Sequence, residues 1–94
     1  MAIYRITRFT SSDIQKAIAM AEDARDEVAA AGADFIDIAA DADGNGVVVA
    51  KYPDAATMEA ATAIAQKVFG QMVAEGVMDG GSISIWSGEV VNSM

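Results

Sequence analysis

The feature that most constrains the fold of this chain is a pair of strand-like segments joined by a turn. The segments cover residues 34–40 and 47–52, and the joint between them contains Asp43-Gly44 and Asn45-Gly46. Glycine reaches positive φ without steric cost, and Asn and Asp tolerate it, so such dipeptides close tight turns. The pattern therefore predicts a central β-hairpin.

A helical pattern precedes this hairpin. Over residues 14–28, apolar residues recur at helical spacing and charged residues cover the opposite side. We expect Ser12 to be the N-cap, in a capping box with Gln15, and Gly32 to end the helix in a left-handed conformation. The alanines of the apolar stripe predict a close approach to a sheet.

A second helical pattern follows the hairpin and covers residues 58–73. We expect Asp54 to be its N-cap and Gly76 to be its end, while Gly70 marks either a bend or the start of a second short helix. The apolar side contains Met and Phe, which predicts ordinary core or, alternatively, the wall of a ligand pocket.

Two further strands complete the pattern, at residues 3–9 and 82–87. Gly88 suggests a bulge, and residues 89–91 then resemble more strand, which could pair with a partner subunit. The resulting order is strand-helix-strand twice. It predicts one α+β domain over residues 1–94 with a ferredoxin-like βαββαβ fold, a four-stranded antiparallel sheet with two helices on one face.

The other face of this sheet needs a cover. Its candidate rows are semi-apolar, namely Phe35-Asp37-Ala39 and Ser82-Ser84-Trp86, and 53% of the chain is hydrophobic. A second copy of the chain supplies the cover most simply, because two sheets can meet face to face under twofold symmetry. We therefore expect a homodimer formed through the open sheet face.

The formal net charge of −8 argues against partners that are themselves anionic. Only six Lys and Arg residues are spread over the chain, so neither nucleic acid nor an anionic membrane surface is an expected partner. No apolar run is long enough to span a bilayer and no signal peptide opens the chain, which makes a cytoplasmic protein the default expectation.

The chain contains neither histidine nor cysteine. This composition excludes a Ser-His-Asp or Cys-His mechanism, a thiolate metal site and a His ligand for haem iron. The hairpin joint matches the first half of an EF-hand calcium loop, but Tyr52 stands where a bidentate Glu is required. The residues of a tight turn explain the match, so we expect no metal and no cofactor.

The segment Lys51-Tyr-Pro-Asp-Ala-Ala-Thr-Met-Glu-Ala60, taken with the element order, resembles the dimeric α+β barrel superfamily. The nearest branch is similar to the antibiotic biosynthesis monooxygenases. The resemblance implies a homodimer with a pocket in each subunit between sheet and helices. Many members carry a His early in the second helix, where this chain has Ala60-Ala61. No catalytic residue therefore carries over by position. The haem-degrading relatives need a His ligand, so we expect this chain to lack their activity.

Four residues are candidates for the wall of a ligand pocket: Tyr4, Arg8, Tyr52 and Trp86. An aromatic cluster can hold a planar ligand, and an arginine can hold a carboxylate or phenolate. Each face of the first strand carries one arginine, so Arg5 replaces Arg8 if the strand faces the other way. Alternatively, these residues pack in the core or the dimer interface. Asp37 pairs naturally with a strand arginine, and if it is buried its expected role is a structural ion pair and not that of a general base.

Three functions remain open at this point. The first is a homodimer that binds a small hydrophobic or aromatic molecule. The second is a cofactor-independent monooxygenase or isomerase, for which only tyrosines and carboxylates could take a proton. The third is a structural or oligomerising module. The absence of obvious acids and bases from the candidate pocket favours the first.

Overall fold

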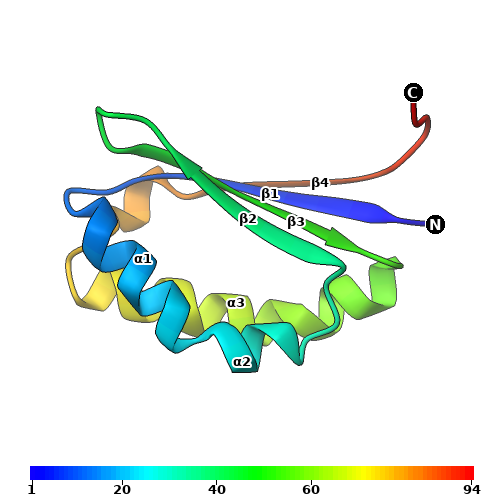
Figure 1. The fold of residues 1–94 in the computed structure, drawn as a ribbon, viewed down its shortest axis with the longest axis horizontal. Helices are drawn as coiled ribbons and strands as arrows, with labels where there is room; N and C mark the ends of the chain where they lie inside the picture. The colour runs from blue at the N-terminus through cyan, green and yellow to red at the C-terminus, as the bar shows by residue number, and fades with distance from the viewer.

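A computed structural model describes residues 1–94 and confirms the predicted ferredoxin-like α+β fold (Figure 1). The strands are β1 (Ile3–Thr10), β2 (Phe35–Ala40), β3 (Asn45–Tyr52) and β4 (Ser84–Glu89). They form one antiparallel sheet in the order β2-β3-β1-β4. The helices are α1 (Ile14–Asp23), α2 (Arg25–Ala29), α3 (Ala55–Ala74) and the 3-10 turn η1 (Gly80–Ser82). The long helices cover one face of the sheet.

The central hairpin is closed by the side chain of Asp41. Its carboxylate accepts hydrogen bonds from the backbone N–H groups of Asp43 and Asn45, at 2.9 and 3.0 Å. Gly44 has a φ of +86°, as a turn glycine requires. The Asn45-Gly46 pair, in contrast, lies inside β3. Gly46 is needed there because a Cβ would collide with the ring of Phe9.

The first helical pattern forms two helices instead of one. The N-cap of α1 is Asp13, whose carboxylate accepts from the Lys16 N–H at 3.1 Å, and Ser12 does not cap. The Ser12 hydroxyl instead donates to the Gly76 carbonyl at 3.2 Å, which ties the start of α1 to the end of α3. The helix breaks at Ala24, between α1 and α2, and Gly32 follows with the expected positive φ.

The predicted ends of the second helix are correct. Asp54 caps α3 by accepting from the Thr57 N–H at 2.7 Å, and Gly76 follows its end with a φ of +74°. The helix passes through Gly70 without a break. Gly70 is exposed, and its missing side chain would meet no neighbour, so the packing does not require a bend there.

The last strand begins two residues later than predicted and continues through Gly88 to Glu89. Residues 80–82 form η1, where the Asp79 carboxylate accepts from the Gly81 N–H at 3.0 Å, so β4 begins at Ser84. Gly88 pairs with Tyr4 in unbroken register and forms no bulge. Residues 90–94 lie beyond β4. No helix combines the length and hydropathy that crossing a bilayer requires.

The core on the helix side of the sheet is divided. One cluster joins Phe9, Ala17, Met72, Val77 and Met78 at one end of the sheet. A second cluster joins Ile3, Ala50, Tyr52 and Ala61 at the other end. Only 10 of the 94 residues are buried, and no large side chain is fully enclosed. The chain therefore leaves much of the space between sheet and helices unfilled.

Candidate functional site

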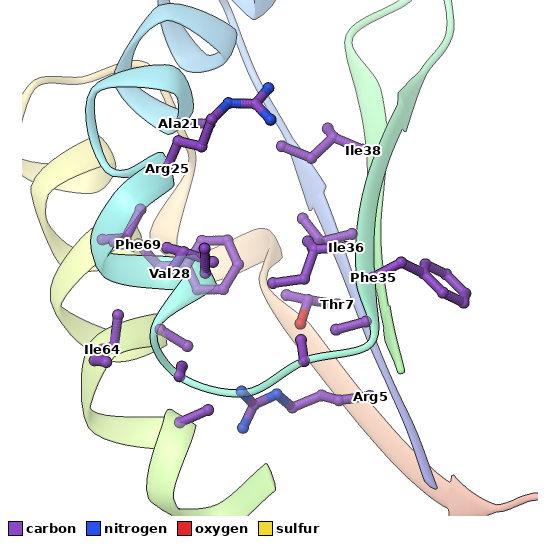
Figure 2. A pocket seen from close by; sticks show the side chains of 18 of the residues that line it. Arg5, Thr7, Ala21, Arg25, Val28, Phe35, Ile36, Ile38, Ile64 and Phe69 are labelled. Atoms are coloured by element: carbon purple, nitrogen blue, oxygen red, sulfur yellow. The ribbon is translucent and has the colours of Figure 1, made fainter. Parts of the chain in front are cut away.

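A cavity of about 360 Å³ lies between the sheet and the helices (Figure 2). Its walls come from β1, β2, β3 and all three α-helices, and 17 of its 22 lining residues are hydrophobic. Figure 2 shows Arg5 at one end and Arg25 at the other, with Ile36, Val28 and Phe69 between them. The volume falls within the range of ligand pockets, about 300–1,000 Å³.

Alanine explains why this space is empty. Seven of the lining residues are alanines: Ala21, Ala29, Ala31, Ala33, Ala50, Ala61 and Ala65. They come from the three α-helices, the segment before β2, and β3. At most of these positions a leucine or phenylalanine would reach into the cavity, whereas a methyl group does not. Close approach to the sheet was predicted for the alanines of the first helical stripe: Ala17 packs in the core with Phe9 as expected, whereas Ala21 lines the cavity.

Arg5 is a half-buried charged residue of the cavity wall. Its Nη1 donates to the Thr62 hydroxyl at 2.9 Å, and its Nη2 donates to the Tyr52 hydroxyl at 3.0 Å. The guanidinium carbon also lies 5.4 Å from the centre of the Tyr52 ring. Both hydrogen-bond acceptors are neutral. The three ion pairs of the chain all involve other residues, which shows that no carboxylate lies within ion-pair distance of Arg5.

Thr7 follows Arg5 on the same face of β1, because successive residues of a strand alternate between the two faces. Its side chain is 3% exposed and lines the cavity. Figure 2 shows the Thr7 hydroxyl on the cavity side of the strand. The side-chain hydrogen bonds of the chain do not include this hydroxyl. Arg5 and Thr7 thus present two polar groups to the cavity, whose other charged lining residues are Glu22, Arg25 and Asp34.

The second arginine of the cavity lies at its rim. Arg25, at the start of α2, forms an ion pair with Glu22 of α1, and both side chains are more than half exposed. Their hydrogen bond is the main reason that the pKa of the Glu22 carboxyl is lowered and that of the Arg25 guanidinium is raised. The charge of Arg25 is therefore already paired, unlike that of Arg5.

The four residues predicted to line one pocket are divided between the two faces of the sheet. Tyr52 lines the cavity, but Tyr4, Arg8 and Trp86 lie on the outer face, away from the helices. On β1 it is Arg5, and not Arg8, whose side chain faces the helices and lines the cavity. The four do not form a common pocket wall, and the binding of a ligand by any of them stays a prediction.

The outer face of the sheet is a mixed apolar surface. Tyr4 contacts Phe35 edge to face, with ring centroids 6.2 Å apart, and Lys51 lies 5.8 Å from the centre of the Tyr4 ring. Trp86 is 60% exposed and its indole covers Gly88. Asp37 is exposed and forms none of the three ion pairs, so the expected pairing with a strand arginine is absent.

Comparison with solved structures supports the ferredoxin-like α+β fold that the sequence predicts. No protein-family model matches the chain, and no curated protein sequence is significantly similar to it. Solved structures are similar over nearly the whole chain. The three structures described below are 14% to 16% identical to this chain, and similarity at this level establishes the fold alone.

Three of these structures illustrate the match. Rv0793 from Mycobacterium tuberculosis is 16% identical, covering 99% of this chain and 98% of that chain, with a TM-score of 0.75. A dimeric ferredoxin-like protein from an uncultured marine organism is 16% identical with the same coverage and a TM-score of 0.72. An antibiotic biosynthesis monooxygenase is 14% identical, covering 98% of this chain and 100% of that chain, with a TM-score of 0.67.

Proposed function

We propose that this protein binds a small hydrophobic, preferably aromatic, molecule in the cavity between sheet and helices. The observation that carries the proposal is the cavity of about 360 Å³ between the two core clusters. Protein interiors normally pack as densely as organic crystals, so an apolar hollow of this size in a small domain is a departure from ordinary packing. A ligand that fills it would join the two clusters into one core.

The cavity also favours the proposed ligand binding over a purely structural role. A structural or oligomerising module has no need for a hollow on the helix side of its sheet. The outer face, which a partner copy would cover, lies on the other side of the sheet; of its residues, Phe35 at the start of β2 also borders the cavity, although its ring points away from it (Figure 2). Ligand binding and dimerisation therefore use different surfaces.

We further propose that the functional unit is a cytoplasmic homodimer formed through the outer face of the sheet. The large exposed side chains of Phe35 and Trp86 lie on this face, together with Tyr4 and Val49. A similar solved structure is described as dimeric. Covering these side chains would remove apolar surface from water, which is the main source of stability in most subunit interfaces.

A second candidate function is a cofactor-independent monooxygenase or isomerase. Two observations favour it: the similarity to an antibiotic biosynthesis monooxygenase, and the Tyr52 hydroxyl beside a guanidinium in the cavity. In such a reaction Tyr52 would be the group within reach of a substrate proton. Binding of an aromatic compound without turnover in air would favour the first function over this one.

A thermal-shift screen of aromatic compounds tests the proposed function. Ligand at 100 times its dissociation constant adds about 2.7 kcal/mol, which raises the melting temperature of a domain this size by on the order of 10 °C. We expect Ala65→Leu, which fills the cavity, to abolish the shift. Ala63→Leu is the matched control, because Ala63 is exposed on the same helix. An equal shift in both variants would place the ligand elsewhere.

A further inference from the structure

We propose that Arg5 and Thr7 form a receptor for an oxyanion, so that the ligand is a small and largely apolar organic acid. This inference rests on the proposed function, because it assigns the chemical class of the molecule that occupies the cavity. The ligand would place its carboxylate, or an equivalent enolate or phenolate oxygen, on the Arg5 guanidinium and its apolar body among the alanines and isoleucines of the walls.

The distribution of positive charge in the chain supports this assignment. The chain has only six cationic side chains against 14 acidic ones. Three of the six are paired with glutamates: Lys16, Arg25 and Lys67. Arg8 and Lys51 lie on the outer face of the sheet. Arg5 is therefore the one cation that faces the cavity without a carboxylate partner.

An unpaired cation in a partly buried position is unusual in an acidic protein. Removing a charge from water is costly unless an opposite charge or hydrogen bonds replace the lost hydration. Thr62 and Tyr52 hold the Arg5 guanidinium in place with one hydrogen bond each, but they leave its other N–H groups free. A carboxylate is the group that matches the planar fork of a guanidinium, with two parallel hydrogen bonds.

Thr7 supplies a second polar group beside Arg5. The residue as a whole is 3% exposed, and its hydroxyl lies on the cavity side of β1. No buried polar side-chain atom of the chain lacks a hydrogen-bond partner, so this hydroxyl is accessible from the cavity and can donate to a ligand there. Because Thr7 and Arg5 are two residues apart on β1, their side chains project from the same face of the strand. Together they can donate to the oxygens of a single anion.

A matched pair of probes tests the inference: 1-naphthoate and 1-naphthamide have the same apolar body and differ in charge. We expect titration calorimetry to show that the unmodified protein binds the acid on the order of tenfold more tightly than the amide. Arg5→Met should remove this preference, and Thr7→Val should reduce it. Arg8→Met is the matched control, since it makes the same change on the opposite face of β1.

The outcomes separate this inference from the proposed function. Equal affinity of the unmodified protein for acid and amide, or a preference that survives in Arg5→Met, would overturn the oxyanion receptor and leave the hydrophobic site intact. If neither probe binds, and larger and smaller acid–amide pairs also fail, the proposed function and the receptor both fall. The comparison of the two probes on the unmodified protein needs no variant, so it holds even if Arg5→Met does not fold.

Discussion

The guanidinium of Arg5 and the hydroxyl of Tyr52 are joined by a 3.0 Å hydrogen bond that runs from β1 to β3 at the wall of the cavity. The two residues are diagonal neighbours, since Arg5 pairs with Ala50 and Ile3 pairs with Tyr52. Long side chains can bridge this diagonal on one face of a sheet. The bond fixes the orientation of the only unpaired cation in the cavity.

We expect Tyr52→Phe to keep the fold and to lower the free energy of unfolding by about 1–2 kcal/mol. The ring that packs in the core is retained, but a hydrogen bond to a charged group is lost. Denaturant unfolding measures the change. Tyr4→Phe is the control, because the Tyr4 hydroxyl takes part in no hydrogen bond within the chain, and it should change stability little. An unchanged stability of Tyr52→Phe would contradict the structural role of the bond.

We expect Ala65→Leu to stabilise the ligand-free protein by about 0.5–2 kcal/mol, as cavity-filling substitutions commonly do. The added side chain would enter the hollow that Ala65 lines and bury apolar surface there. Thermal unfolding without ligand measures the effect, and exposed Ala63→Leu gives the baseline. A loss of several kcal/mol would mean that the space is too small for a leucine.

We expect Trp86→Ser to weaken the proposed homodimer by at least tenfold, because a tryptophan at the centre of an interface commonly contributes 2 kcal/mol or more. Ile85→Ser is a closely matched control: Ile85 and Trp86 are both 60% exposed and adjacent in β4, but they face opposite sides of the sheet. Sedimentation velocity over a range of concentrations distinguishes them. A dimer weakened equally by both substitutions would place the interface at the edge of β4.

We expect the stabilisation of α3 by its cap to depend on pH. The hydrogen bonds from Thr57 lower the pKa of the Asp54 carboxyl below its ordinary value of 3.8. A carboxyl whose pKa is lower in the folded state stabilises the protein above the unfolded pKa, and this contribution is lost as the pH falls through the folded pKa. Asp54→Ala should therefore lower the melting temperature at pH 7 and have a progressively smaller effect as the pH falls below 3.8.

The variant Asp54→Asn distinguishes the contribution of the Asp54 charge to helix stability from that of its capping hydrogen bond. Asparagine is also a good N-cap but does not titrate, so this variant should retain much of the helix stability without the acid-dependent part. If the melting temperatures of Asp54→Ala and the unmodified protein differed equally at pH 7 and pH 2, ionisation of Asp54 would have no part in the capping.

The sequence predicted the fold because its local signals agree with the tertiary arrangement. The Asp43-Gly44 turn, the Asp54 cap and the alternation of the strands all specify the same element order that the structure shows. The ends of elements were less predictable. Asp13 rather than Ser12 caps α1, because Ser12 is used in a contact with Gly76, more than sixty residues away in the sequence.

The site was predictable only in part, because its position depends on which face of β1 meets the helices. The strand carries Arg5 on one face and Arg8 on the other, so local pattern could not choose between them. Thr7 gave no signal of its own, since threonine is an ordinary strand residue. The run of alanines around residues 29–33 and 60–65 was a usable signal, but a sequence does not show whether small residues bring elements together or leave a space.

The division of the core has a consequence for the lifetime of the protein in a cell. Without a bound ligand, the cavity separates the two core clusters, so local opening should be more frequent and proteases should cleave the chain more readily. With the ligand bound, the folded protein would be more stable and would resist proteolysis. The abundance of this protein would then rise and fall with the supply of the compound it carries, with no separate regulator.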